Sequence, residues 1–269
     1  MARARLISTA LVIGVFVAAC GGSATTAPGA SSGTGPGTSE APASVAPGSS
    51  QSGGSGDVTA GDAFNSASNA LDTLDSYKFD VEINSSSTST FGSEGTTSFT
   101  GVVVNKPDKA QLLDEVEKDP QGNVTSEFHF LIIGQQAWTK DTADGTYTEV
   151  PSAMATGMLA GLAAFQPQKL FGTAFGALGA DYHLVGTEQK NGVNAQHFSG
   201  DESIGTFFAS LAGVSGTWTS DVWLAADGGY LVASTVAVQA ATATSAGNFS
   251  IDVQITNVND PGNALQPPS

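Results

Sequence analysis

Cysteine is almost absent from this 269-residue chain: its single cysteine is Cys20, near the start. An exported domain that relied on disulfides would carry an even set of cysteines spread through its body. A disulfide framework is therefore excluded for residues 21–269. The uncharged run at residues 6–19 has 14 residues, and a helix needs roughly 20 apolar residues to cross a bilayer core. A transmembrane anchor is not expected there.

Arginine is also scarce, and residues 20–269 contain none. In that range 7 lysines stand against 25 acidic residues, a net charge of 7 − 25 = −18. Nucleic-acid binding requires a basic surface that releases phosphate counterions, so it is excluded. The missing guanidinium groups also remove the usual bidentate clamp for phosphate or carboxylate, and a strongly anionic ligand is not expected.

Cys20 follows the pattern of a bacterial export signal. Two arginines precede the uncharged run at 6–19, and small residues stand immediately before the cysteine. The tetrapeptide Val17-Ala18-Ala19-Cys20 resembles the lipobox, whose cysteine is lipidated on sulfur and becomes the first mature residue. We therefore expect a signal peptide at 1–19 and an acylated Cys20, carrying for example palmitate. The alternative is an ordinary secretory signal with a chance cysteine.

A low-complexity tether follows the cysteine. Of the 36 residues in 21–56, 27 are Gly, Ser, Thr or Pro, and only Glu40 is charged. Such a composition cannot bury a core, so residues 20–56 are predicted to form a disordered linker. A flexible chain of this length has a root-mean-square reach of roughly 30 Å. The linker would hold the following domain clear of the membrane.

Residues 57–269 are long enough for one domain with a substantial core. Thr59 and Asp62 are spaced as a capping box, and four apolar residues then recur at helical spacing: Phe64, Ala67, Leu71 and Leu74. The stretch "SYKFDVEIN" instead alternates apolar and polar residues, which predicts a half-buried strand. Further strands are expected near 97–105, 109–117 and 124–133. Their short connections imply antiparallel order.

The second half of the domain repeats this pattern. Asn191-Gly192 favours a tight hairpin between "DYHLVGTEQ" and "VNAQHFSG", because this pair tolerates positive φ. The segment 226–229 predicts a similar turn between "TWTSDVWLA" and "YLVASTVAV". The stretch "NFSIDVQITNV" at 248–258 is expected to close the sheet, and the segment 201–213 looks like a short helix with acids at its start.

An apolar insertion interrupts the strands at residues 152–179. It is rich in glycine, and Lys169 is its only ionisable residue. Pro167 divides it into two short helical stretches. Methionine adapts to irregular apolar partners and glycine lowers helix stability. One interpretation is a mobile apolar cover over the sheet; the other is that the two helices simply pack on the core.

The order of elements and three short motifs resemble the LppX/LprG lipoproteins of actinobacterial envelopes, which are similar in turn to the LolA and RseB folds. The motifs are Gly192-Val193 with His197, Asp221-Val222-Trp223 with Gly229 and Leu231, and Asn259-Asp260-Pro261. The resemblance spans the domain from about Gly61 to the C-terminus. It implies an α+β fold in which a single strongly bent antiparallel sheet, a half-barrel, wraps helices around an apolar cavity.

The resemblance implies a carrier that binds the acyl chains of a lipid or glycolipid and moves it within the cell envelope, anchored at the outer face of the cytoplasmic membrane. The expected cavity residues are Met154, Met158, Leu162, Phe165, Leu170, Phe171 and Phe175. Family members often carry a basic residue where this chain has Val232 and Ala233, so a neutral ligand is expected. An envelope transporter is a further expected partner. The alternative function is a tethered interaction or sensor module, like RseB.

No catalytic residue, metal site or cofactor is expected. His129 lies in the apolar run "FHFLII", which favours a buried core histidine. His183 and His197 lie on neighbouring predicted strands, but no metal-binding spacing accompanies them. No G-x-S-x-G nucleophile motif occurs. The segment 141–149 lacks the third-position acid and the length of an EF-hand loop, so a turn explains it.

The remaining acidic and aromatic candidates have plain structural interpretations. Asp80 and Glu82 alternate onto one side of a strand, which predicts a solvated face. The three tryptophans, Trp138, Trp218 and Trp223, are expected to fill the core rather than to stack on a sugar.

Overall fold

The structure is a computed structural model, and it describes residues 60–86, 94–151, 154, 155, 157, 167, 181–200, 209, 216–240 and 248–268. All of them belong to one structural unit, residues 57–269. The predicted signal peptide, Cys20, the linker and nearly all of the predicted 201–213 helix lie outside the described residues. Within the described part, none of the helices is both long and apolar enough to cross a membrane.

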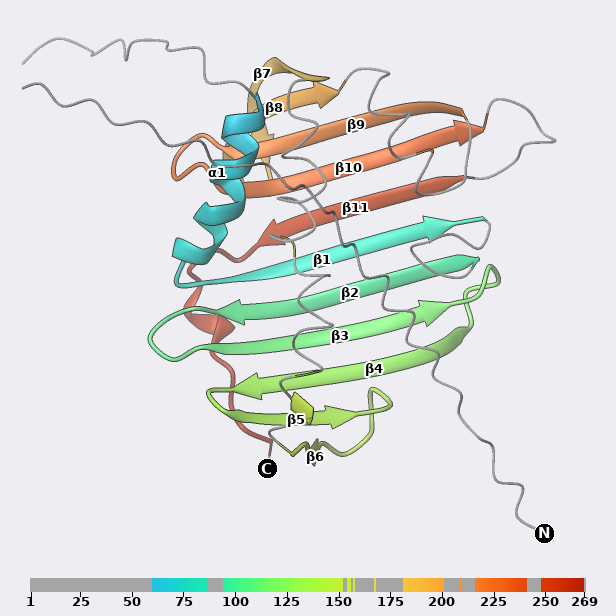
Figure 1. Ribbon diagram of the computed structural model, residues 1–269, viewed down its shortest axis with the longest axis vertical. Coiled ribbons are helices and arrows are strands. Elements are labelled where there is room, and N and C mark those ends of the chain that lie inside the picture. Colours follow the sequence, from blue (N-terminus) through green and yellow to red (C-terminus); the bar gives the residue numbers. More distant parts are fainter. Residues whose placement is uncertain are drawn as a thin grey trace, which may run out of the picture. The chain divides into compact units, whose positions relative to one another are not determined.

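The main elements of the described residues are helix α1 and strands β1–β11 (Figure 1). Their bounds are α1 Ala60–Thr73, β1 Ser76–Ser85, β2 Gly95–Val104, β3 Ala110–Lys118, β4 Val124–Ile133, β5 Gln136–Lys140, β6 Thr148–Glu149, β7 Tyr182–Lys190, β8 Val193–Gly200, β9 Gly216–Ala225, β10 Leu231–Ala240 and β11 Phe249–Thr256. A short 3-10 helix, η3, follows at Pro261–Asn263.

All eleven strands form one antiparallel sheet in the order β6-β5-β4-β3-β2-β1-β11-β10-β9-β8-β7. Two meanders, β1–β6 and β7–β11, meet where β1 pairs with β11, with Val81 opposite Val253. The predicted α+β class with a single antiparallel sheet is confirmed, and the expected strands lie within two residues of their predicted bounds.

The strands separate an apolar face from a polar face. On β1 the side chains of Tyr77, Phe79, Val81 and Ile83 are buried, whereas Lys78, Asp80 and Glu82 are exposed. The register carries this alternation across the sheet, and we call the buried side, on which α1 packs, the inner face. The predicted half-buried strand and the predicted solvated face for Asp80 and Glu82 are both confirmed.

The helix α1 lies on the inner face at the β7 end of the sheet. Three of the four residues that the helical spacing predicted are buried: Phe64, Ala67 and Leu71. The fourth, Leu74, follows the end of the helix and is half-buried. The Phe64 ring meets the Tyr182 ring edge-on at 4.9 Å between centroids and the Phe198 ring at 5.4 Å. The helix touches both β7 and β10, which are three positions apart in the sheet. Three strand spacings of about 4.8 Å are shorter than this 14-residue helix at 1.5 Å per residue, so α1 crosses the strands from β10 to β7.

The β7–β8 hairpin turn has the backbone that its sequence predicted, with φ of 51° at Asn191 and 77° at Gly192. The Asn191 side chain also holds distant strands together. Its Nδ2 donates to the Val232 carbonyl and the Ile255 carbonyl, both at 3.2 Å, and to Gln254 Oε1 at 2.9 Å. The turn therefore ties β7 and β8 to β10 and β11.

The three tryptophans are each 9% exposed, which confirms that they are buried. Trp218 belongs to the inner core, but Trp223 lies in a smaller cluster with Ala195, Ala225, Val232 and Ala233. His197 stacks on the Trp223 ring at 4.5 Å, and Lys190 Nζ lies 4.0 Å from its centroid. The Trp223 ring is thus packed by protein groups.

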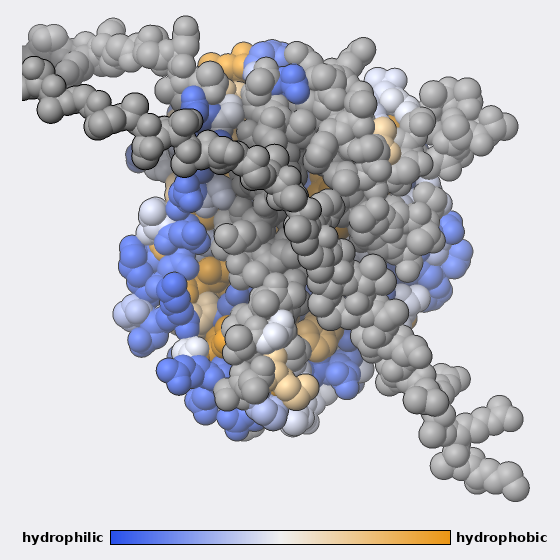
Figure 2. Space-filling view, in the orientation of Figure 1, coloured by the Kyte–Doolittle hydropathy of each residue, from blue (hydrophilic) through white to orange (hydrophobic). Residues whose placement is uncertain are grey.

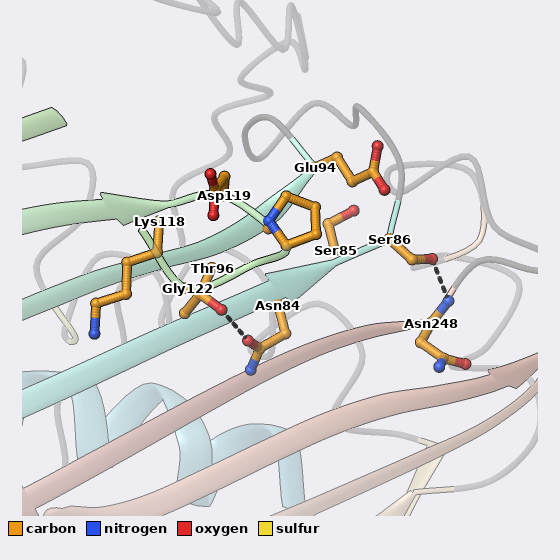
Figure 3. Close-up of a pocket in the computed structure, with 11 residues that line it drawn as sticks. Asn84, Ser85, Ser86, Glu94, Thr96, Lys118, Asp119, Gly122 and Asn248 are labelled. Carbon is orange, nitrogen blue, oxygen red and sulfur yellow. Dashed lines mark hydrogen bonds between the residues drawn. The ribbon is translucent and has the colours of Figure 1, made fainter. Parts of the chain in front are cut away.

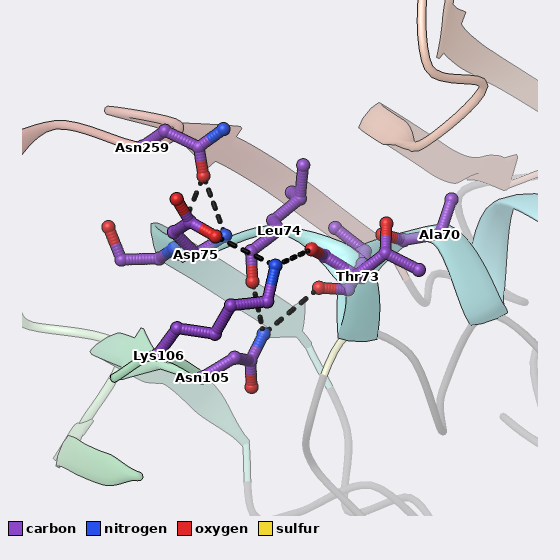
Figure 4. A network of polar contacts seen from close by, with 9 residues as sticks. Ala70, Thr73, Leu74, Asp75, Asn105, Lys106 and Asn259 are labelled. Carbon is purple, nitrogen blue, oxygen red and sulfur yellow. Dashed lines mark hydrogen bonds and ion pairs between the residues drawn. The ribbon is translucent and has the colours of Figure 1, made fainter. Parts of the chain in front are cut away.

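Polar side chains of one distant segment satisfy the C-terminal end of α1 (Figure 4). Asn105 Nδ2 donates to the Leu71 and Leu74 carbonyls at 3.2 and 3.0 Å, and Lys106 Nζ donates to the Thr73 carbonyl at 2.9 Å. The last carbonyls of a helix have no intrahelical partner. The segment after β2 therefore supplies the missing donors and fixes the position of α1.

We predict that Asn105→Ala lowers the free energy of unfolding by about 1–2 kcal/mol, because it removes two hydrogen bonds worth roughly 0.5–1.5 kcal/mol each. The matched control is Asn69→Ala on the exposed side of α1. The Asn69 side-chain amide donates to the Asn65 carbonyl of the same helix. Changes at such surface positions are usually within about 0.5 kcal/mol. Urea unfolding measures both, and equal losses for the two variants would contradict the capping role.

Candidate functional site

The inner face carries the larger of the two clusters of buried apolar residues in the described part of the chain. Its core extends from β4 and β5 across β1 to β8, and its largest fully buried side chains include Tyr77, Phe64, Phe130 and Phe249. Figure 2 looks onto this side and shows hydrophobic residues over the strands, with hydrophilic residues gathered along the margins. The described residues thus form a broad apolar core on one side of the sheet, and polar residues lie along its margins.

The predicted apolar insertion begins on this face. Met154 and Ala155 are helical, and their amides donate to the Pro151 carbonyl at 2.9 and 3.1 Å. Ala155 is 4% exposed and belongs to the inner core, whereas Met154 is 61% exposed. Of the other predicted cavity residues, Met158, Leu162, Phe165, Leu170, Phe171 and Phe175 lie outside the described residues. Their role stays a prediction.

The inner face changes character along β3. Leu113 is buried on this face, and the next two residues that point the same way are Glu115 and Glu117. Glu115 stands between Phe99 on β2 and Phe128 on β4. Burial raises the pKa of the Glu115 carboxyl, and the nearby Glu117 carboxylate raises it further. One end of the apolar face is therefore acidic.

Two adjoining cavities, of 340 and 270 Å³, lie at this acidic end, where β1 and β3 end and β2 begins (Figure 3). They share Glu94, Thr96, Lys118 and Asp119, and we call them together the rim cavity. The other lining residues of the larger cavity are Asn84, Ser85, Ser86, Gly95, Pro120, Gly122 and Asn248. Those of the smaller cavity are Thr97, Glu117 and Thr125. The lining residues include no aromatic side chain.

Hydrogen bonds hold the lining of the rim cavity in place. Thr96 Oγ1 donates to Asn84 Oδ1 at 2.7 Å, and Asn84 Nδ2 donates to Glu82 Oε1 at 2.8 Å. Ser86 and Asn248 exchange two bonds: the Asn248 amide donates to Ser86 Oγ at 2.7 Å, and the Ser86 amide donates to the Asn248 carbonyl at 2.9 Å. The end of β1 is thereby fixed to β2 and to the segment before β11.

Asp119 shapes the opposite wall. Its carboxylate accepts from the Gln121 amide at 2.9 Å and from the Asn123 amide at 2.8 Å, and the Asn123 side chain donates to both of its oxygens. These bonds, led by the Asn123 side chain, lower the pKa of Asp119 below its usual value. Asp119 therefore stays ionised and is engaged in its own turn.

The histidines do not converge with the rim cavity. His129 is 6% exposed, and its Nδ1 lies 2.5 Å from Asp114 Oδ1, which confirms a buried, hydrogen-bonded histidine. His197 Nε2 lies 2.9 Å from Asp221 Oδ1, and His183 is exposed. Within the described ranges, no cluster of three or more metal-ligating side chains occurs. The segment 141–149 contains the turn that the sequence predicted, and it also includes the two-residue strand β6, which was not predicted.

Comparisons with solved structures give similarities of low identity. LprF from Mycobacterium bovis shares 18% identity over 78% of this chain and 97% of that one, with a TM-score of 0.45. The Mycobacterium tuberculosis lipoprotein LppX shares 18% identity over 75% of this chain and 96% of that one, with a TM-score of 0.41. The MucA/MucB complex of Pseudomonas aeruginosa gives 12% identity over 77% of this chain and 61% of that one, with a TM-score of 0.31. LprF and LppX belong to the family that the sequence resembles. No family model and no curated protein sequence matches the chain.

We predict that Glu115→Gln raises the free energy of unfolding at neutral pH, because it removes a carboxylate that burial and Glu117 both disfavour. A carboxyl whose folded pKa is raised contributes stability at low pH, and that contribution is lost as the pH rises through the folded pKa. The gain in stability of the variant should therefore shrink as the pH falls toward 4. Urea unfolding from pH 4 to 8 measures it, with exposed Glu149→Gln as the control. A gain that is the same at every pH would contradict this account.

Proposed function

We propose that residues 57–269 form a lipid-binding domain that carries acyl chains within the cell envelope. The observation that supports this proposal is the inner face: the side chains of one open sheet form an apolar core on this side, with members from both meanders. The ligand would be a lipid or glycolipid with one or more acyl chains. The domain would have no chemistry of its own.

The physical basis is the cost of apolar surface and of imperfect packing. Removing apolar area from water contributes roughly 25 cal/mol per Å². The helix α1 covers only the β7 end of the sheet. The insertion at 152–179 begins on the same face at Ala155, and we propose that it covers acyl chains there. A cavity left between glycine-rich helices and the sheet is costly when empty, and acyl chains would relieve that cost.

Anchoring and location belong to the same proposal. Cys20 would carry the acyl groups that hold the protein at the outer face of the cytoplasmic membrane. Each buried methylene contributes about 0.8 kcal/mol, so two or more chains are needed for stable anchoring. The acidic domain is repelled by an anionic membrane surface. The linker at 20–56 would therefore keep the domain mobile near the membrane and able to exchange lipid with an envelope transporter.

Native mass spectrometry of the secreted Cys20→Ala protein, purified without detergent from a related host, tests this proposal. We expect a defined lipid adduct at near-equal stoichiometry. Leu162→Asp and Phe175→Asp should each remove at least nine-tenths of the adduct, because a charge in an apolar site opposes acyl binding. The matched control is Val185→Asp on the edge strand β7, where the side chain is 56% exposed and the adduct should persist.

Circular dichroism on the same samples separates lost lipid from lost folding. A persistent apo mass after incubation with host envelope lipids would contradict the carrier function, and the tethered interaction module would then be the better account. Unchanged lipid content in both Asp variants would exclude the insertion from the site.

A further inference from the structure

The rim cavity has no role in acyl binding, yet it adjoins the acyl-binding face. We propose that it is the head-group subsite of the carrier and takes an uncharged head group rich in hydroxyls, such as a sugar ring or a polyol, while it rejects phosphate. This inference rests on the proposed function and adds the place and the chemistry of the polar end of the ligand.

The position follows from the register of β1, β2 and β3. On the inner face Ile83 is followed by Ser85, Phe99 is preceded by Thr97, and Leu113 is followed by the two glutamates. Ser85 and Thr97 are each 7% exposed, and both line the rim cavity together with Glu117. An acyl chain lying along the apolar part of this face would therefore place its polar end at the rim cavity.

The chemistry of the lining matches hydroxyl groups. Amide and hydroxyl side chains are interspersed with carboxylates and with the glycine backbone. Each hydroxyl of a sugar both donates and accepts a hydrogen bond, and such a mixed lining offers partners for both roles. The 340 Å³ cavity is at the lower end of the roughly 300–1,000 Å³ typical of small-molecule sites. The Thr96–Asn84 bond lies on the outer side of the sheet, with Glu82, whereas the Ser86–Asn248 bonds fix the end of β1 before the ligand arrives, which lowers the cost of binding.

The charges of the rim cavity exclude phosphate. Glu94, Glu117 and Asp119 line it, and Lys118 is its one cation. The Lys118 side chain extends away from Glu94 and Ser86 in Figure 3. Like charges brought together across a binding surface are costly, so a phosphodiester head group would be disfavoured. Uncharged hydroxyls avoid this repulsion and can donate to the same carboxylates.

Three probe lipids with identical acyl chains test the inference: dioleoylglycerol, monoglucosyl-dioleoylglycerol and dioleoylphosphatidylglycerol. Detergent-free Cys20→Ala protein is mixed with equal amounts of all three, and native mass spectrometry measures the bound fractions. We expect the glucosyl lipid to bind at least 5-fold better than dioleoylglycerol, and phosphatidylglycerol to bind at least 5-fold worse.

Two variants locate the selectivity. Thr97→Val, which removes an inward-facing hydroxyl of the rim cavity, should bring the glucosyl preference to within 2-fold of dioleoylglycerol without changing dioleoylglycerol binding. Glu117→Lys should raise the share of phosphatidylglycerol at least 5-fold. The matched control is Thr187→Val, an exposed threonine on β7 far from the rim cavity in the sheet order, which should alter neither ratio.

The outcomes separate this inference from the proposed function. If none of the three lipids binds, the carrier function itself is overturned. Equal binding of all three, or a preference for phosphatidylglycerol, overturns the head-group subsite and leaves the carrier intact. If methyl glucoside alone binds as tightly as the glucosyl lipid, the rim cavity is a site for free sugar and the head-group role is overturned.

Discussion

The antiparallel pairing of β1 with β11 is the contact on which the rest of the structure depends. It joins residues 76–85 to residues 249–256 and turns two separate meanders into one sheet. Closing so long a loop has an entropic cost that must be offset by burial. Val81 opposite Val253 and Phe79 opposite Ile255 supply that burial, at roughly 1.5–3 kcal/mol for each fully buried side chain. Only the joined sheet carries the continuous apolar face on which the proposed acyl binding depends.

The same strands divide two kinds of surface. Lys78, Asp80 and Glu82 point away from the inner face, and Glu82 stands directly opposite Asp252 on β11. Like charges in that position are mildly destabilising, but they keep the outer face hydrated and soluble. At the ends of β1, β2 and β3 the polar and apolar surfaces meet in the rim cavity. An amphiphile is the class of ligand that suits such a boundary, because its two ends need the two surfaces.

Local features of the fold could be predicted from the sequence, and non-local ones could not. Alternation in "SYKFDVEIN" predicted β1 and its two faces, and Asn191-Gly192 predicted a hairpin turn, because both depend on neighbouring residues. The resemblance to a known family supplied the single bent sheet. The capping of α1 by Asn105 and the rim cavity were missed, because they depend on which distant segments meet. The in-phase Glu115 and Glu117 on an otherwise apolar side of β3 were the one sequence signal for the acidic end.

The central claim is that acyl chains lie on the inner face of the sheet. The most direct measurement is photo-cross-linking of detergent-free Cys20→Ala protein loaded with a neutral dioleoyl-type lipid that carries a diazirine in the middle of one chain. Peptide sequencing by mass spectrometry then locates the attachment sites. The account predicts attachment at inward-facing residues such as Phe99 and Val253 and within residues 152–179. Attachment confined to outward-facing residues such as Lys78 and Asp252, or none at all, would contradict it.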